Sequence, residues 1–567
     1  MATVAEWFLR GLALHDVDAI FINPGTDTPA LQEAYARLTH EQVKLPRLVT
    51  CPHEVIACTA AQGAYLTTGR AQVALVHVDV GTANAAGALN DARASQIPLI
   101  LCAGMSPSAL DSAVPGGRSK FINWHQDVPD QHALVRNYTK WTQTVSLPAA
   151  VGPAVDRAFQ IANSEPPGPV YLAFPRETLM SEVEASGLMG PQRIRAVPQG
   201  TLSAAEAEAI VEALLAAEFP LLLTAYAGRT PATRAAFVEL AERTGSGISE
   251  YRGRFNAPLD HPQHLGFNPE QQVVDADVVL IIDHDVPFVP ADLKLRDDVR
   301  LIHMGNDPIQ QRWTTWGFPT DAVHAVHVPA AIEALLTAAR ARSDDPRIAP
   351  RRAALAARHA TMMAERARRR AAALAGGAIS PMEVGAILSR LAPEAMVIEE
   401  AVTSGNPFAY GFEPNAEGGY YRNGGSYLGW ALGASLGARL GDPERLVVSV
   451  VGDGAFMFGA PTPALWAARE NGLPLLIIIL NNESYNSVVL ATRHDFAGGA
   501  QDTFGHVGSL LPQSPAFETL AEACGAFGRR VTRMDDVEPA LQEALAAVRS
   551  GRSAVVNIMT EAAQKPL

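Results

Sequence analysis

Short apolar runs that end in turn residues alternate with longer amphipathic stretches along most of the chain. In the first third, this pattern predicts helices at 85–94 and 153–163 and buried strands at 19–22, 73–78, 99–101 and 170–174. Strands that alternate with helices in this way are typical of a parallel sheet covered by helices. The pattern therefore places the first third in the α/β class.

The same alternation continues in two further segments. After a Pro- and Gly-containing break near 187–200, we expect a helix at 203–217 and strands at 221–224, 278–282 and 299–304. From about residue 378, strands are expected at 396–398, 446–451, 475–480 and 554–558. A chain of 567 residues is long enough for about three domains. We therefore expect three doubly wound parallel-sheet domains at 1–185, 190–340 and 378–567, with a linker helix at 341–377.

The linker region is rich in Ala and Arg, and it includes the run from Arg368 to Arg370. Such a run can form an anion-binding surface, but charge runs on helices usually face solvent. We therefore interpret this region as a solvated helix.

Composition narrows the class of protein. Lys and Arg number 45 against 59 Asp and Glu, a formal charge of −14, which argues against nucleic acid or an anionic membrane as the main partner. The four cysteines form no CxxC pair, so free thiols are expected. The first ten residues lack the pattern of a signal peptide, and the apolar runs are too short to span a bilayer. We expect a cytoplasmic enzyme.

The strongest chemical signal lies in the third segment. The strand at 446–451 runs into Gly452-Asp453-Gly454, and the strand at 475–480 runs into Asn481-Asn482. The carboxyl ends of parallel strands are where open α/β sheets bind ligands. Glycines let the backbone approach a phosphate, while carboxylate and amide oxygens suit magnesium. Gly-Asp-Gly alone is also compatible with a tight turn, but its combination with strand-Asn-Asn favours a phosphate and metal site.

Residues 452–482 resemble the cofactor motif of the thiamine-diphosphate (ThDP) enzymes. The resemblance implies ThDP bound near Gly452 and Gly454, and Mg²⁺ held by the Asp453 side chain, the Asn482 side chain and the Ser484 carbonyl. The interval from Asp453 to Asn482 is a residue or two longer than in many relatives, and we place the extra length at 459–463.

The resemblance extends upstream to residues 424–429. It implies that Leu428 wedges under the cofactor and bends it, although a core leucine in a Gly-rich turn would look the same. Glu400, Thr403 and Ser404 fall where relatives bind the diphosphate through backbone and hydroxyl groups, although hydroxyls here could also cap the next helix.

The first segment contains Cys51-Pro52-His53-Glu54, which resembles the sequence around the family's essential glutamate. The resemblance implies that the Glu54 carboxyl bonds the pyrimidine nitrogen of ThDP and favours the imino tautomer, which deprotonates the thiazolium carbon. A glutamate at the start of a helix can also simply compensate the helix dipole. Its presence beside the motif at 452–482 favours the catalytic role.

Two further stretches resemble benzoylformate decarboxylases. In 23–26 the resemblance places Thr26 in a substrate-binding position, and in 76–84 it makes His77 a catalytic residue. A histidine that titrates near neutral pH suits proton transfer, although a histidine at the end of a buried strand is usually structural. His125 occupies the place of a histidine pair in some decarboxylases, which makes it a second acid–base candidate.

The remaining pocket residues are less specific. Ser487 and Val488 should line the substrate pocket, and the lack of a glutamate near Val488 argues against a simple pyruvate decarboxylase. His284 is offset from the place of the second histidine of benzoylformate decarboxylases, which weakens the case for benzoylformate itself. The central segment has only a thin Gly-rich turn at 225–228, so FAD is not expected there.

Together these features predict a ThDP- and Mg²⁺-dependent decarboxylase or carboligase acting on a 2-oxo acid. In such enzymes CO₂ leaves the cofactor adduct, and the resulting enamine is protonated or captured by an aldehyde. The alternatives are an acetolactate-synthase-like transferase, a 2-hydroxyacyl-CoA lyase and a non-catalytic ThDP-binding regulatory homologue, the last disfavoured by Glu54. The resemblance also implies a homo-oligomer, a dimer or a dimer of dimers, with active sites shared between subunits.

Overall fold

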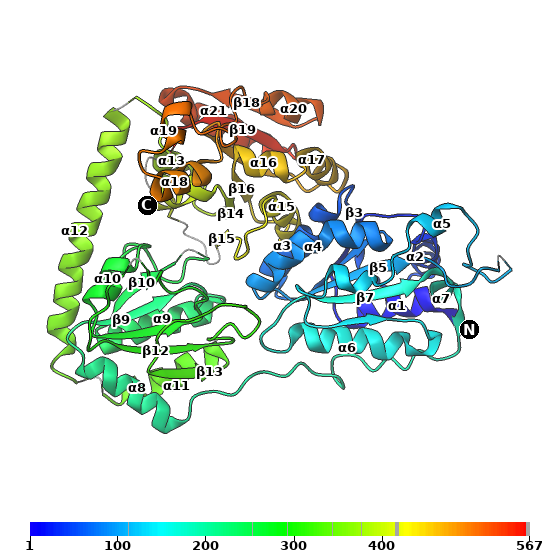
Figure 1. Ribbon diagram of the computed structural model, residues 1–567, viewed down its shortest axis with the longest axis horizontal. Coiled ribbons are helices and arrows are strands. Elements are labelled where there is room, and N and C mark those ends of the chain that lie inside the picture. Colours follow the sequence, from blue (N-terminus) through cyan, green and yellow to red (C-terminus); the bar gives the residue numbers. More distant parts are fainter. Residues whose placement is uncertain are drawn as a thin grey trace. The chain divides into compact units, whose positions relative to one another are not determined.

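The computed structural model describes residues 1–562 except 112, 252, 292, 343, 376 and 414–418. It contains three larger sheets with helices packed around them, which confirms the predicted α/β fold with three doubly wound sheets (Figure 1). The chain forms two compact units. The first unit consists of Met1–Val197, Val397–Gly405 and the residues from Asn423 onward, and the second consists of Pro198–Met396 and Asn406–Arg422. The domain boundaries expected from the sequence stay predictions.

The first sheet lies in the first unit and has the strand order β3-β2-β4-β5-β7-β6. Its strands are β2 (Ala19–Ile22), β3 (Arg47–Thr50), β4 (Gln72–Val76), β5 (Leu99–Met105), β6 (Thr142–Thr144) and β7 (Val170–Pro175). Its helices are α1 (Val4–Leu14), α2 (Pro29–His40), α3 (Glu54–Thr68), α4 (Val78–Ala94), α5 (Ile122–His125), α6 (Val151–Asn163) and α7 (Arg176–Met180). A small antiparallel pair joins β1 (Ala2–Thr3) to β8 (Glu182–Val183).

The direction of winding in the first sheet reverses between β2 and β4. The chain goes from β2 outward to β3, and then returns past β2 to β4, so neighbouring loops diverge at the carboxyl ends of β2 and β4. Asn23 follows β2 and His77 follows β4, which places both residues at this switch point. The strand expected at 73–78 ends earlier, at Val76, because His77 is already the N-cap of α4.

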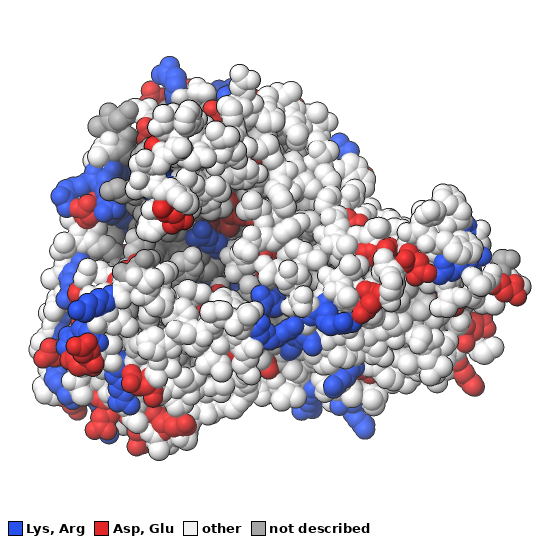
Figure 2. All heavy atoms as spheres, viewed as in Figure 1, with Lys and Arg blue, Asp and Glu red and all other residues white. Residues whose placement is uncertain are grey.

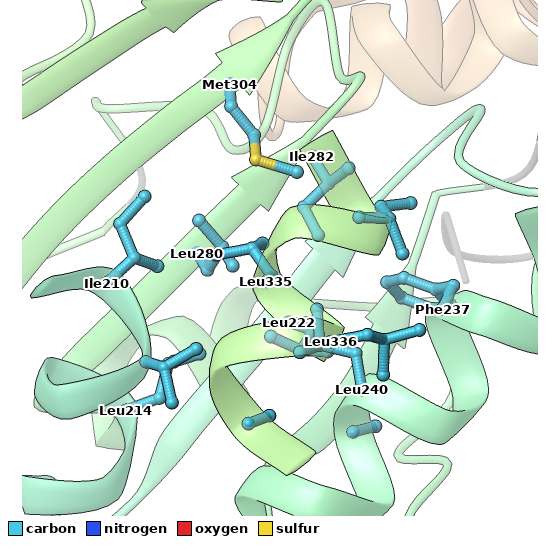
Figure 3. Close-up of a cluster of buried hydrophobic side chains, with 14 of the residues drawn as sticks. Ile210, Leu214, Leu222, Phe237, Leu240, Leu280, Ile282, Met304, Leu335 and Leu336 are labelled. Atoms are coloured by element: carbon cyan, nitrogen blue, oxygen red, sulfur yellow. The ribbon is translucent and has the colours of Figure 1, made fainter. Parts of the chain in front are cut away.

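The central sheet lies in the second unit, with the order β10-β9-β11-β12-β13. Its strands are β9 (Pro220–Thr224), β10 (Gly247–Glu250), β11 (Val278–Ile282), β12 (Arg300–Gly305) and β13 (Ala322–Ala325). Its helices are α8 (Ala204–Ala216), α9 (Pro231–Thr244), α10 (Glu270–Asp275) and α11 (Val328–Arg340). Figure 3 shows how α8, α9 and α11 bury leucine, isoleucine and phenylalanine side chains against Leu222, Leu280 and Met304 of the sheet.

The long helix α12 (Ile348–Ala375) follows the central sheet (Figure 1). Arg368 and Arg369 pair with Glu365 on the same helix, and both arginine side chains are more than half exposed. Arg370 pairs with Glu383 of α13 (Pro381–Leu391). These arginines thus have partners on the surface, as expected of a solvated helix. Figure 2 shows basic and acidic side chains interspersed on the visible face.

The third sheet has the order β15-β14-β16-β17-β19-β18, and its winding reverses between β14 and β16. Its strands are β14 (Met396–Glu400), β15 (Tyr420–Arg422), β16 (Val447–Gly452), β17 (Leu476–Asn481), β18 (Phe527–Val531) and β19 (Ala554–Met559). The helices that follow α13 are α14 (Gly405–Gly411), α15 (Trp430–Gly441), α16 (Asp453–Phe458), α17 (Pro461–Glu470), α18 (Asn486–Asp495), α19 (Ala500–Phe504), α20 (Phe517–Ala523) and α21 (Val537–Arg549).

Helices α3 and α15 join the first and third sheets within the first unit. A Cβ at Gly63 would overlap the Ala434 carbonyl, and a Cβ at Gly437 would overlap the Ala60 carbonyl, so glycine lets the two backbones touch. The buried Trp430 donates its indole N–H to Gln62 at 3.1 Å. This contact fixes the start of α15 against the helix that begins at Glu54.

Within the described part of the chain, no helix combines the length and apolar character needed to cross a bilayer. The four cysteines are free thiols, as expected, and Cys51, Cys58 and Cys102 are buried.

Candidate active site

Glu54 is the first residue of α3, and two amide side chains hold its carboxylate. Asn23 donates to Oε1 and Asn84 donates to Oε2, each at 2.7 Å. His53 caps the helix by accepting the Val55 N–H. Asn23 comes from the loop after β2 and Asn84 from α4, so residues distant in sequence orient both oxygens of Glu54 at the switch point of the first sheet.

His77 lies beside this group, and its Nδ1 bonds the carboxylate of Asp27. The hydrogen bond with Asp27 raises the pKa of His77, with burial acting in the opposite direction. The Asp27 side chain is 2% exposed and that of His77 is 23% exposed. Sequence reasoning missed Asp27. The available signal was a carboxylate one residue after Thr26, in the loop that follows a strand at a switch point.

Thr26 and His125 occupy different surroundings from His77. Both residues are exposed, and His125 ends α5 with its ring against Phe121. The next residue, Gln126, is buried, and its side chain also raises the pKa of His77. Of this stretch, Gln126 is therefore the residue that acts on His77, and the roles of Thr26 and His125 stay predictions.

The switch point of the third sheet carries Asp453, which begins α16 directly after β16. Burial raises the pKa of this carboxyl to about 6, while the backbone amides of Gly454, Asp453, Ser484 and Glu483 act in the opposite direction. Its Oδ2 is buried and has no hydrogen-bond partner among the described residues. A buried carboxylate oxygen without a partner is costly, and a bound cation would compensate for that cost.

Asn482 and Ser484 form the turn that faces Asp453. The Oδ1 of Asn482 accepts both the Ser484 N–H and the Ser484 hydroxyl at 3.0 Å. The neighbouring Glu483 has a φ of 52°, a left-handed conformation that closes the turn. Asn481 differs from Asn482 because its amide donates to Asn557 in the core of the sheet. The Oδ1 of Asn481 accepts the Glu483 N–H at 3.1 Å, so Asn482 is the asparagine that bonds Ser484.

These oxygens fit a magnesium ion. In the described residues, no group of three or more His, Cys, Asp or Glu side chains could hold a metal. A site here would therefore combine one carboxylate with amide and carbonyl oxygens, a set that suits a hard cation completed by phosphate oxygens. The antiparallel bridge to Leu510 uses the Tyr485 N–H and the Glu483 carbonyl rather than the carbonyl of Ser484.

Glu400 stabilises the start of α15. Its carboxylate accepts the Gly429 N–H at 2.8 Å and the Ala431 N–H at 3.0 Å, and burial raises its pKa to about 8. A carboxyl at the N-terminus of a helix satisfies free N–H groups and complements the helix dipole. Glu400 therefore fixes the backbone next to Leu428, which is partly exposed.

The loop before Leu428 is also held by α4. Asp91 is buried and accepts the Tyr427 N–H at 3.2 Å, and Ser95 accepts the Gly424 N–H at 3.0 Å. Burial raises the pKa of Asp91 well above its usual range. Sequence reasoning missed Asp91, because its partner Tyr427 is more than 300 residues away in the chain.

The remaining candidates flank the same edge. Thr403 accepts a hydrogen bond from Asn486 at 3.3 Å, and Ser404 is buried in a short 3₁₀ turn. Ser487 and Val488 are exposed in the first turn of α18. Their roles in binding stay predictions.

Two family models match the chain. The N-terminal TPP binding domain of the thiamine pyrophosphate enzymes covers residues 2–134, and the C-terminal TPP binding domain covers residues 406–558. The first match includes Glu54 and His77, and the second includes Leu428, Asp453 and Asn482.

Curated relatives match over nearly the full length. The probable 2-ketoarginine decarboxylase AruI of Pseudomonas aeruginosa is 27% identical, over 94% of this chain and 90% of that protein. Benzoylformate decarboxylase of the same species is 25% identical, over 97% and 98%. Acetolactate synthase of Bacillus subtilis is also 25% identical, over 96% and 91%.

Solved structures have the same fold. The thiamine diphosphate-dependent 4-hydroxybenzoylformate decarboxylase of Rhodococcus jostii RHA1 superimposes with a TM-score of 0.78 at 23% identity, over 99% of this chain and 100% of that chain. Benzoylformate decarboxylase from Polynucleobacter necessarius gives 0.79 at 19%, over 100% of both chains. With both cofactor-binding domains matched and the fold shared from end to end, the chain belongs to the thiamine pyrophosphate enzyme family.

Proposed function

We propose that this protein is a ThDP- and Mg²⁺-dependent lyase that decarboxylates a 2-oxo acid and can pass the acyl fragment to an aldehyde. The proposal rests on two carboxylates, one at the switch point of the first sheet and one at the switch point of the third sheet. One is the carboxylate of Glu54, held by two amides, and the other is the buried carboxylate of Asp453, whose Oδ2 has no partner among the residues that the structure describes. Relatives named as decarboxylases of 2-oxo acids support the substrate class.

The cofactor would be held mainly at the third sheet. Asp453, Asn482 and the Ser484 carbonyl would hold Mg²⁺, and the metal would fix the diphosphate near Gly452 and Gly454. Thr403 and Ser404 supply hydroxyls at the same edge. When bound, ThDP supplies a thiazolium carbon that adds to the substrate carbonyl and takes up the electrons released as CO₂ leaves.

Glu54 would exchange a proton with the pyrimidine ring of ThDP. Its two amide bonds fix the direction of the carboxyl, so that one oxygen can share a proton with the ring nitrogen. His77 would donate a proton to the carbonyl oxygen of the 2-oxo acid and take it back from the same oxygen as the product is released. Its half-buried ring and raised pKa suit a group that alternates between acid and base.

A second candidate is a transferase similar to acetolactate synthase. Curated acetolactate synthases are 25% identical to this chain over most of its length. Such an enzyme would share the cofactor site and differ in the acceptor, which is a second 2-oxo acid rather than a proton or an aldehyde. Product analysis separates the two candidates directly.

The active site is proposed to be shared between two copies of the chain. In the part of the chain that the structure describes, no hydrogen bond or ion pair joins Glu54, Asn84 or His77 to Asp453 or Asn482. Large apolar side chains are also exposed, including Val488 on α18 and Phe504 on α19. Both observations support at least a homodimer with two sites per pair.

Mixing experiments test this arrangement. An inactive His77→Ala chain mixed with an inactive Asp453→Ala chain should recover activity, because each heterodimer keeps one complete site. No recovery after proven subunit exchange would contradict a shared site.

The function itself is tested with purified protein, ThDP and Mg²⁺. We would screen benzoylformate, pyruvate and 2-ketoarginine, and measure CO₂, aldehyde and acetolactate. Release of CO₂ with aldehyde would support the proposal, and acetolactate would support the second candidate. Tight ThDP binding without turnover of any 2-oxo acid would contradict both and favour a regulatory homologue.

A further inference from the structure

The two nitrogens of the His77 ring have different surroundings. Its Nδ1 bonds Asp27, whose side chain is 2% exposed, while the His77 side chain is 23% exposed. Nε2 is therefore the nitrogen that can meet a substrate. We infer that Asp27 is a positioning residue, which keeps the Nδ1-protonated tautomer of His77 and so assigns the exchange of the reacting proton to Nε2. This inference rests on the proposed function of His77.

Two glycines make room for the Asp27–His77 pair. A Cβ at Gly25 would overlap the His77 ring, and a Cβ at Gly104 would overlap the Asp27 carboxylate. Any larger residue at either position would displace one partner. The absence of a side chain at both positions leaves room for the His77 ring beside Gly25 and for the Asp27 carboxylate beside Gly104.

Val78 adds a second contact to Asp27. Its N–H points to Asp27 Oδ2 at 3.4 Å, and its φ is 35°. A β-branched residue in the left-handed region is strained, and tertiary contacts must hold it there. Strain of this kind directly after His77 indicates that the geometry of the pair is maintained against a local cost.

Buried polar groups lie next to Asp27. Gln131 donates to the Gly104 carbonyl at 2.9 Å and to the Tyr171 hydroxyl at 2.7 Å. The Tyr171 hydroxyl also bonds Thr82 at 3.0 Å. Burial raises the pKa of Tyr171 to about 12, and the charge of Asp27 contributes in the same direction. Tyr171 therefore stays neutral beside the carboxylate, and does not compete with His77 as a proton donor.

The charged groups that act on the ring come from two elements. Asp27, from the loop after β2, and Asp79, from α4, raise the pKa of His77 together with the amide of Gln126, and burial lowers it. The His77 cation, stabilised by Asp27, donates its Nε2 proton to the carbonyl oxygen of the 2-oxo acid. The neutral ring that remains keeps its proton on Nδ1, and its Nε2 takes the proton back from that oxygen as the product is released.

A matched pair in the same unit provides the control. His15 Nε2 bonds Asp156 Oδ1 at 2.7 Å, and both side chains are buried. Asp156 also accepts the Met189 and Gly190 N–H groups, and burial lowers the pKa of His15. This pair also joins a histidine ring to a buried carboxylate, but through Nε2, and neither residue belongs to the proposed site. Asp156→Asn therefore measures what loss of a His–Asp bond does to the fold.

The first measurement needs no substrate. In the holoenzyme with ¹⁵N-labelled histidine, and with His77→Gln to assign the signal, NMR should show His77 as the Nδ1–H tautomer with a pKa above 6.5. A ring protonated at Nε2, or a pKa below 6.5, would overturn the inference. This result stands or fails whether or not a 2-oxo acid is the substrate. The tautomer is read in the parental chain, and His77→Gln serves only to assign the signal.

The second measurement is kinetic, with the best 2-oxo acid of the screen. Asp27→Asn should lower kcat/KM by about 10²–10⁴-fold and shift the pH profile to lower pH, whereas Asp156→Asn should leave the profile unchanged. In the His77→Gln background, Asp27→Asn should add less than about twofold, because the residue acts through His77. Equal losses in both backgrounds would show that Asp27 is merely structural.

Discussion

The carboxylates at the two switch points of the first unit differ in how fully their oxygens are hydrogen-bonded. In the first sheet, both oxygens of Glu54 accept amide protons and His77 has its partner Asp27. In the third sheet, Asp453 is buried with an oxygen that no described group satisfies. Glu54 and Asp27 therefore have their partners within the fold, whereas Asp453 would gain a partner for Oδ2 from a bound cation. The two sites should therefore respond differently to mutation and to metal.

The largest expected effect is at Asp453. Asp453→Ala should abolish Mg²⁺-dependent ThDP binding, because the only carboxylate in the proposed ligand set is lost. In the parental protein, ThDP with Mg²⁺ should raise the melting temperature, and removal of the metal with EDTA should reverse the rise. Calorimetry and thermal unfolding measure both effects. The control is Asp535→Ala, an exposed residue of the same region. Unchanged affinity in Asp453→Ala would refute the ligand assignment.

The next effect concerns Glu400, whose buried carboxyl has a pKa of about 8. Because this pKa lies above the unfolded value of about 4.5, the carboxyl contributes stability below pH 4.5, and the contribution is lost as pH rises through 8. Between these limits the loss should be on the order of a few kcal/mol. Glu400→Gln removes the titration, so its free energy of unfolding should fall less over this range. Parallel pH curves for the two proteins would contradict the assignment.

A smaller effect tests the contact that joins the two regions. Gly437→Ala would push a methyl group into the Ala60 carbonyl and force α15 away from α3. Overpacking of this kind costs about 1–3 kcal/mol. Denaturant unfolding of the apoprotein should show the loss. Gly200→Ala is the control, because nothing lies within 4 Å of a Cβ there. If both variants have equal stability, then the close approach of the helices is not required.

Much of the fold could be predicted from the sequence, because buried parallel strands are short apolar runs. The strands expected at 19–22 and 278–282 agree with β2 and β11. The helix that begins at Asp453 was not predicted, because six residues are too few to show a helical period. Element ends also depend on capping, as at His77.

The candidate site could be predicted in part, since the two family motifs lie in continuous stretches. What the sequence could not reveal are partners that only tertiary structure brings together. Asp27 meets His77 across 50 residues, and Asp91 meets Tyr427 across 336. Glu400 was expected near the diphosphate, and the structure shows that its carboxylate caps α15. No local spacing encodes such contacts.

The central claim is that Glu54 and the site at Asp453 act on one cofactor. The most direct test is hydrogen–deuterium exchange at the thiazolium carbon of ThDP in the holoenzyme, measured by rapid quench and NMR. The parental protein should exchange this proton much faster than free ThDP does. Glu54→Gln should bind ThDP with similar affinity but lose about 10²–10⁴-fold of the exchange rate, while the exposed control Glu33→Gln keeps it. Exchange in Glu54→Gln at the parental rate would contradict the account.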